Sequence, residues 1–381
     1  MTARTAVALV VFAASAVAPL LSQSTLQPRR PPVPLPEEWW TGKIDKPLKC
    51  SSREYPAILG FDFRYWTGID FTLDLKQFLP LRRGRRMYVL FRVTPEGRAS
   101  RYFWQRQFIP AGLNLPPDVK LKDIQITVGG GVHLGVGKYR IDAIAVDQDG
   151  RACRERWNVN AKAIAEPLRQ EPLTVETLPP SKPREPSAPT QRVAIVANAD
   201  TFGPRRYGSK LSARDRSTLI DSLQSLAATW DTADFSLDLL DIERRRVLLS
   251  APRLEPATFD KLDQSLRGVD TLTVDLESLK RGARGAFLSR FIEENMSKWA
   301  GFDAVIFIGP AWRWFDRLPD EARRRNRDLP KLYHLAMTPF RLPPANLIKQ
   351  FVDSQDGMVL NVNQPADLAR GIKRIRQHDK P

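Results

Sequence analysis

The hydrophobic pattern of the chain changes on either side of a proline-rich segment, Glu166 to Arg192, which reads EPLRQEPLTVETLPPSKPREPSAPTQR. This segment has repeated prolines and no apolar periodicity, so it cannot bury enough surface to fold by itself. Short alternating apolar runs precede it, and strand-like runs interleaved with amphipathic stretches follow it. With 381 residues, the chain is long enough for a domain on each side. We therefore expect domains at 50–165 and 192–378, joined by a linker at 166–191.

The region before the linker is predicted to be an all-β sandwich of the Ig-like kind. Its apolar residues alternate in short runs such as MYVLFRVT and KYRIDAIAVD, punctuated by turns such as DQDGR. Close spacing of such runs is typical of antiparallel sandwiches. The Asp149-Gly150 turn predicts a hairpin, whereas Gly129 to Gly131, which no helix follows, is interpreted as a loop or bulge.

Three tryptophans of this region, Trp66, Trp104 and Trp157, have two interpretations. The favoured one places them in the core and in cross-strand pairs. The alternative is a platform for binding sugars.

The region after the linker is predicted to be an α/β domain with a doubly wound, mostly parallel sheet. Val193 to Ala199 is a continuous apolar run, as in a strand that is covered on both faces. The runs FSLDLLD and RRVLLSAP lie so close together that they must pair as a hairpin, which adds one antiparallel strand. Amphipathic periodicity predicts helices, with Ser212 as a cap of the first, at about 213–229, 255–266, 283–299, 344–354 and 365–377.

The first 23 residues, MTARTAVALVVFAASAVAPLLSQ, have the layout of a secretory signal peptide: a basic start, an apolar run, then small residues. A proline-rich lead-in is expected at 24–49. Pro19 obscures the cleavage point, so an uncleaved membrane anchor is the alternative. The prediction is export to the periplasm or the cell exterior, with membrane attachment only if the leader is retained.

The chain contains two cysteines, Cys50 and Cys153. In an exported protein the natural prediction is one disulfide, and two buried free thiols are the alternative. Neither cysteine belongs to a CxxC or Cys/His arrangement, and His133, His334 and His378 are far apart in the sequence. A structural zinc site is therefore not expected.

The formal net charge is +16, from 59 basic and 43 acidic residues. Such an excess is compatible with an anionic partner, for example nucleic acid or a charged cell-wall polymer. The excess is spread out, and no nucleic-acid-binding motif accompanies the densest runs LRRGRR, ERRR and EARRRNRD. We expect solvated arginine-rich faces and no nucleic-acid partner, and adhesion to an anionic surface polymer stays open.

The stretch from Arg192 to Gln377 resembles the von Willebrand factor type A domain. The resemblance is carried by LYHLAMTPFRLPPANLIKQFVDSQDGMVLNVNQPADLARGIKRI and by RRVLLSAPRLEPATFDKLDQSL, in that family's order of elements. The combination with a β-sandwich and a linker is similar to exported bacterial proteins related to this family. The resemblance implies a metal site at the tip of the first strand and binding at the loop end.

The family's metal site uses a DxSxS motif, because a hard divalent cation prefers oxygen ligands. Here the corresponding letters are NADTF, with Asn198 at the aspartate position, Asp200 at the first serine and Phe202, which cannot ligate, at the second. The resemblance thus implies a degenerate site, in which Asn198, Asp200 and Thr201 hold Mg²⁺ or Ca²⁺ at most weakly, with no other cofactor. The alternative is a turn and a helix cap.

Two further positions of the family's site also lack clear matches. Thr271 or Thr273 is a doubtful match to the loop threonine, and Pro310 and Ala311 replace the last aspartate.

A candidate binding loop, GPAWRWFDRLP, spans Gly309 to Pro319. It combines large apolar area with charge, the composition of interface hot spots, in Trp312, Arg313, Trp314, Phe315 and Asp316. The alternative is that two of these aromatic side chains pack beneath a neighbouring helix.

The function predicted from the sequence is an exported, non-catalytic binding or assembly protein whose partner is a protein of the cell envelope. A metal-assisted hydrolase using Asp200, Asp270 or Asp316 is the enzymatic alternative. The chain has no GxSxG nucleophile motif and no histidine placed as an evident base, so an enzyme is not expected.

Overall fold

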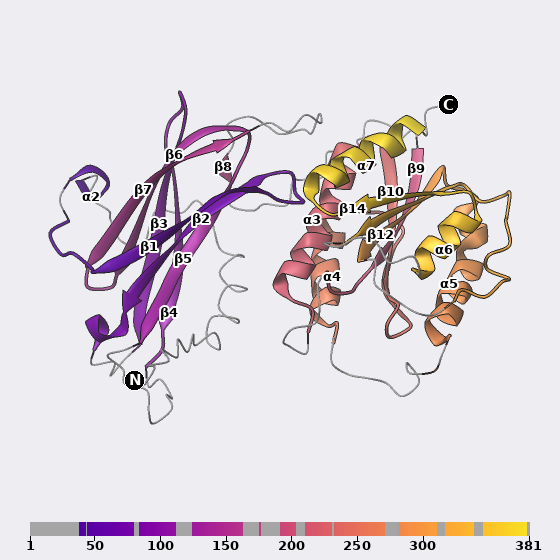
Figure 1. The fold of residues 1–381 in the computed structure, drawn as a ribbon, viewed down its shortest axis with the longest axis horizontal. Coiled ribbons are helices and arrows are strands. Elements are labelled where there is room, and N and C mark those ends of the chain that lie inside the picture. The colour runs from indigo at the N-terminus through magenta and orange to yellow at the C-terminus, as the bar shows by residue number, and fades with distance from the viewer. Residues whose placement is uncertain are drawn as a thin grey trace, which may run out of the picture. The chain divides into compact units, whose positions relative to one another are not determined.

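A computed structural model describes the chain as two compact units, formed mainly by residues 38–162 and 191–378 (Figure 1). The described residues are 38–42, 44–79, 84–111, 124–162, 175–176, 191–202, 210–230, 232–270, 280, 282–310, 317–338 and 346–378. The predicted signal peptide and the residues Trp312 to Asp316 lie outside them. Within the described ranges, no helix is long and apolar enough to cross a membrane.

The first unit contains two four-stranded sheets, with strand orders β1-β2-β5-β8 and β4-β3-β6-β7, in which neighbouring strands run antiparallel. Both sheets contribute to one hydrophobic core, for example Phe71 and Val128 from one and Val89 and Ile141 from the other. The strands are β1 (Cys50–Leu59), β2 (Tyr65–Asp74), β3 (Arg85–Pro95), β4 (Arg101–Ile109), β5 (Gln125–Leu134), β6 (Gly137–Asp147), β7 (Ala152–Ala161) and β8 (Val175–Glu176).

Of the two glycine turns predicted in this unit, the one at Gly150 is present and the one at Gly129 to Gly131 is not. β6 and β7 form the predicted hairpin, and Gly150 has the positive φ of 76° that its turn requires. The interpretation of Gly129 to Gly131 as a loop or bulge is wrong, because these residues lie inside β5 and pair with β2. A Cβ on Gly131 would lie 2.6 Å from Nε1 of Trp66, so the glycine leaves room for this ring.

The three tryptophans differ in burial. Trp157 belongs to the core shared by the two sheets, whereas Trp66 and Trp104 are half-buried. Trp66 packs on Tyr55 and Trp104 on Tyr88, with ring centroids 5.5 Å and 6.2 Å apart.

The predicted disulfide between Cys50 and Cys153 is confirmed. It joins β1 to β7, which belong to different sheets, across a sequence separation of 103 residues and with the Cα atoms 6.4 Å apart. The bond therefore closes a long loop over the core of this unit.

Part of the predicted lead-in is folded against the second of these sheets. The short helix α2 (Glu38–Thr41) places Trp40, which is 2% exposed, in a cluster with Tyr88 and Ile144. The guanidinium of Arg92 lies 5.1 Å from the centre of the Trp40 ring and forms an ion pair with the fully buried Asp142. Two adjacent tryptophans, Trp39 and Trp40, give this segment an apolar surface to bury against the sheet.

The second unit is built on a six-stranded sheet of order β11-β10-β9-β12-β13-β14, in which only β11 is antiparallel. Its strands are β9 (Gln191–Asn198), β10 (Ala233–Asp241), β11 (Arg246–Ala251), β12 (Ala304–Pro310), β13 (Lys331–Met337) and β14 (Met358–Val362). Its helices are α3 (Ala213–Thr229), α4 (Pro256–Arg267), α5 (Ala283–Trp299), α6 (Leu347–Ser354) and α7 (Pro365–His378).

Helices cover both faces of this sheet, α3, α4 and α7 on one side and α5 and α6 on the other (Figure 1). Successive residues of β9 alternate between the two cores, with Val193, Ile195 and Ala197 in one and Ala194 and Val196 in the other. This explains the continuous apolar run seen in the sequence. The coarse fold class, β sheets that include a mixed sheet of mostly parallel strands, is confirmed.

Candidate functional site

The carboxyl ends of β9 and β12 form the switch point of the six-stranded sheet. From β9 the chain passes through α3 to β10 on one side, while β12 pairs with the other side of β9. In doubly wound sheets, the crevice at this reversal of strand order is the usual ligand site. Asn198 ends β9 and Pro310 ends β12, so these two residues define the crevice here.

Asn198 carries a buried polar atom with no partner. Its side chain is 1% exposed, and Nδ2 donates a hydrogen bond to the backbone oxygen of Pro310 at 3.3 Å. A carbonyl only accepts, so this bond fixes which end of the amide points toward Pro310. The remaining atom, Oδ1, has no hydrogen-bond partner among the described residues. Such an atom costs about 1–3 kcal/mol, which a ligand's donor would recover.

Gly309 makes the close approach of the two strands possible. Its φ is 136°, a backbone conformation that residues with a Cβ rarely adopt. A Cβ at this position would lie 2.7 Å from the backbone oxygen of Asn198. The glycine therefore positions Pro310 against the Asn198 amide.

The residues after β9 form a turn that leads toward α3. Asp200 and Thr201 are buried, and Oδ1 of Asp200 accepts the backbone N–H of Thr201 at 2.7 Å. The carboxylate of Asp215, in the first turn of α3, accepts the backbone N–H of Phe202 at 3.0 Å and the hydroxyl of Ser212 at 2.6 Å. Ser212 in turn caps α3 through the backbone N–H of Asp215, as predicted.

The oxygen atoms in this turn do not fit a divalent cation. Phe202 stands where the family's motif has a serine, and its ring packs against the hydrophobic core. A hard cation requires six or more oxygen ligands, and the Asp200 carboxylate already accepts a backbone hydrogen bond. Within the described ranges, no group of three His, Cys, Asp or Glu side chains could hold a metal ion.

Asn346 is a polar residue of this end of the sheet that the sequence analysis did not single out. It caps α6, where its Oδ1 accepts the backbone N–H of Lys349 at 3.1 Å, while its Nδ2 has no partner among the described residues. Asn198 continues the alternation of Ala194 and Val196, so it points to the face that α6 covers. Asn198 and Asn346 thus lie at the same end and on the same face of the sheet, the first with a buried unpaired acceptor and the second with a buried unpaired donor. In the sequence, an asparagine just before an apolar helical stretch was the signal that could have identified Asn346 as a cap.

The remaining predicted site residues are only partly placed. Trp312, Arg313, Trp314, Phe315 and Asp316 lie outside the described residues, and the chain enters this segment directly after Pro310. Thr271 and Thr273 also lie outside them, while Asp270 forms a β-bridge with Lys210.

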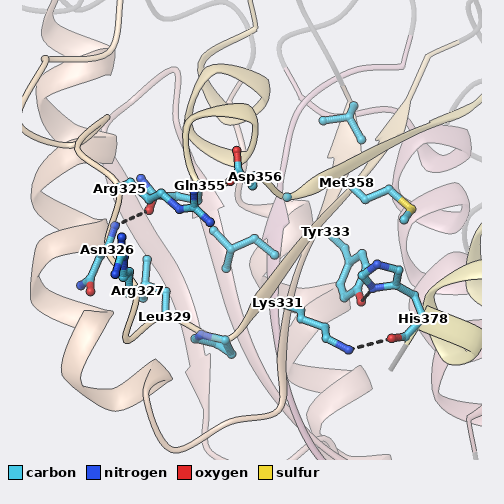
Figure 2. A pocket seen from close by; sticks show the side chains of 14 residues that line it. Arg325, Asn326, Arg327, Leu329, Lys331, Tyr333, Gln355, Asp356, Met358 and His378 are labelled. Atoms are coloured by element: carbon cyan, nitrogen blue, oxygen red, sulfur yellow. Dashed lines mark hydrogen bonds and ion pairs between the residues drawn. The ribbon is translucent and has the colours of Figure 1, made fainter. Parts of the chain in front are cut away.

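A second hollow lies at the opposite end of this sheet, where β13 and β14 begin. This cavity of about 520 Å³ is lined by residues of the segment before β13, by the ends of α6 and α7, and by both strands (Figure 2). Three cationic side chains, Arg325, Arg327 and Lys331, line it, against the single carboxylate of Asp356.

No protein-family model matches the chain, and no curated protein matches it. Among solved structures, one similar chain is a glycosyl hydrolase family 2 member from Bacteroides cellulosilyticus, with 8% identity and a TM-score of 0.20, covering 82% of this chain and 38% of that one. Another is a Bacteroides uniformis beta-glucuronidase, with 8% identity, a TM-score of 0.19, and coverage of 82% and 45%. The chain thus spans less than half of those proteins, and likeness at this level carries no argument about fold or activity.

Proposed function

We propose that this chain is an exported, non-catalytic binding or assembly protein, and that a protein partner docks at the carboxyl end of the six-stranded sheet. In this proposal the second unit is a von Willebrand factor type A-like domain whose metal site has degenerated, and the first unit is an Ig-like β-sandwich.

The strand order supports the proposed domain type. The sheet has the doubly wound order, reversing at β9 and β12, with one antiparallel edge strand after the second strand. The edge strand of that hairpin, β11, lies at the start of one of the two stretches that carry the sequence resemblance.

The observation that carries the binding proposal is the unpaired Oδ1 of Asn198 in the crevice between β9 and β12. Native proteins rarely leave a buried acceptor without a partner, so the atom is best explained by a donor that arrives with a ligand. Because the oxygen atoms of this turn do not fit a cation, a direct hydrogen bond from the partner is the natural way to satisfy it.

The sequence that follows Pro310 supports a protein as the ligand. Trp312, Trp314 and Phe315 provide the large apolar anchors that dominate protein interfaces, and Arg313 and Asp316 provide flanking charge. A partner held by this segment would reach the Asn198 crevice, since Pro310 adjoins both.

Position-specific photo-crosslinking tests the proposal. A benzophenone amino acid replaces Phe202, which is half-buried and follows the carboxyl end of β9, or Arg374, which is exposed on α7, as the control. In cells that export the protein, we expect one crosslinked partner from position 202 and none from position 374. Equal crosslinking from both positions, or crosslinking from 374 alone, would reject the carboxyl end as the docking surface.

A further inference from the structure

The cavity at the amino ends of β13 and β14 is large enough for a small molecule. Its volume of about 520 Å³ lies within the range of about 300–1,000 Å³ that ligand pockets occupy. Lys331 and Met358, the first residues of the two strands, both line it, so it lies at the opposite end of the sheet from Asn198.

The charge of the lining favours an anion. Arg325 forms an ion pair with Asp356 at 2.7 Å, but both side chains are more than 60% exposed, at 63% and 65%, so water competes strongly with this pair. Arg327 has no ion-pair partner in the part of the chain that the structure describes. At least one guanidinium is therefore available to a ligand without breaking an existing pair.

The cationic residues are held on two walls of the cavity. On one wall, the backbone N–H of Asn326 donates to Gln355 Oε1 at 2.8 Å, and Gln355 Nε2 donates to the backbone oxygen of Arg324 at 2.9 Å. These bonds fix the arginine segment to the end of α6. Figure 2 shows Arg325 and Arg327 together on this side, apart from Lys331.

On the other wall, Lys331 Nζ donates to the backbone oxygen of His378 at 2.7 Å, and the hydroxyl of Tyr333 lies 3.0 Å from Nδ1 of His378. Helices α6 and α7 end here, and helix ends of this kind carry partial negative charge. Lys331 offsets that charge at α7 through this hydrogen bond. The arginine pair is therefore the principal anion-binding element.

The lining between the two walls is partly apolar. Leu329, Leu332 and Met358 contribute carbon surface, and Figure 2 shows Leu329 between the arginine pair and Lys331. A ligand with an apolar body and an acidic head would use both parts of this surface.

We propose that this cavity binds a small organic anion, whose carboxylate or phosphate group is held by Arg325 and Arg327 and whose carbon body lies on Leu329 and Met358. The site is separate from the proposed docking surface, so either proposal can fail without the other.

Calorimetry on the full mature chain tests this site with three probes: phenyl phosphate, benzoate and inorganic phosphate. The comparison of phenyl phosphate with benzoate decides between a phosphate and a carboxylate head, and inorganic phosphate measures the contribution of the apolar body. The variant is Arg327→Gln, and the matched control is Arg214→Gln, which removes another exposed arginine, from α3.

We expect an aromatic anion to bind more tightly than inorganic phosphate, with an affinity that falls as salt is added. Arg327→Gln should weaken binding about tenfold, the effect of one charge-assisted hydrogen bond, and Arg214→Gln should leave it unchanged. Unchanged melting temperatures would show that each variant is folded. No heat with either aromatic anion at millimolar concentration, or equal weakening by Arg327→Gln and Arg214→Gln, would overturn the proposal. The cations would then only offset the charge of the helix ends.

Discussion

The side-chain amide of Asn198 donates a hydrogen bond to the backbone oxygen of Pro310, 112 residues away in the sequence. This bond joins the carboxyl ends of β9 and β12, the two strands at which the direction of winding reverses. It also leaves the other amide atom, Oδ1, buried and unpaired among the described residues. The same contact therefore leaves an unsatisfied acceptor at the switch point of the sheet.

Replacing Gly309 by alanine should destabilise the second unit. The new methyl group would lie 2.7 Å from the backbone oxygen of Asn198 at a φ of 136°, so we expect a loss of about 2 kcal/mol or more in the free energy of unfolding. Gly282→Ala is the control, since Gly282 also has a positive φ, 83°, but a methyl group there would meet nothing within 4 Å among the described residues beyond its chain neighbours. Urea denaturation measures both. Equal losses in the two variants would show that the strands do not approach so closely.

The disulfide should stabilise mainly the first unit, which contains both cysteines. Closing a loop of 103 residues corresponds to about 4–5 kcal/mol in the chain-entropy model, so Cys50→Ser with Cys153→Ser should lower the free energy of unfolding by up to that amount. Denaturant unfolding of the oxidised protein and the double variant gives the difference. Two thiols that react with Ellman's reagent in the unreduced, unfolded protein would show that the bond is absent.

His334 should make the second unit sensitive to acid. Burial, together with the charge of Lys349, lowers the pKa of His334 from 6.5 to about 3, and neither ring nitrogen has a hydrogen-bond partner among the described residues. The unfolded chain takes up a proton near pH 6.5 whereas the folded chain does not, so stability is complete above that pH and falls as the pH decreases toward 3. The slope is at most about 1.4 kcal/mol per pH unit.

The variant His334→Leu removes this proton uptake. It should be at least as stable as the native chain at neutral pH, because it leaves no unpaired polar atom, and its stability should decrease less in acid. Urea denaturation at about pH 7 and about pH 4 measures the difference. An identical pH dependence in the two proteins would contradict this role of His334.

Mg²⁺ and Ca²⁺ should bind no more tightly than about millimolar, because the positions of Phe202 and Pro310 supply no side-chain oxygen ligand. Calorimetry with each ion tests this. A micromolar affinity that Asp200→Ala abolishes would show that other residues have rebuilt the site.

Local chemistry allowed much of the fold to be predicted from the sequence. The run Val193 to Ala199 has no polar residue before Asn198, and its burial on both faces of a sheet follows from that alone. Helix α3 begins after Ser212 and ends at Thr229, as expected, because a capping side chain and an apolar stripe define both ends. The disulfide followed from composition and context.

Contacts distant in the sequence could not be predicted in the same way. At Gly129 and Gly131, Asp70 and Trp66 of the neighbouring strand occupy the space that a Cβ would need, so glycines fit within the paired strand. The unpaired atoms of Asn198 and Asn346 depend on which carbonyls and amides lie beside them once the sheet forms. The cavity near Arg327 likewise requires α6 and α7 to end at the same place.

A partner that binds at the carboxyl end of the sheet should depend on the segment after Pro310, so the affinity of the crosslinked partner is the measurement to make. Trp312→Ala with Trp314→Ala, in the segment after Pro310, should weaken this affinity at least about thirtyfold, because truncating one interfacial anchor costs about 2 kcal/mol or more. Phe108→Ala, which removes an aromatic ring that is 63% exposed in the first unit, is the control and should change nothing. We expect the tryptophan variant to lose affinity at an unchanged melting temperature. Unchanged affinity, with a melting temperature lower by several degrees, would assign these tryptophans to the core and contradict this expectation.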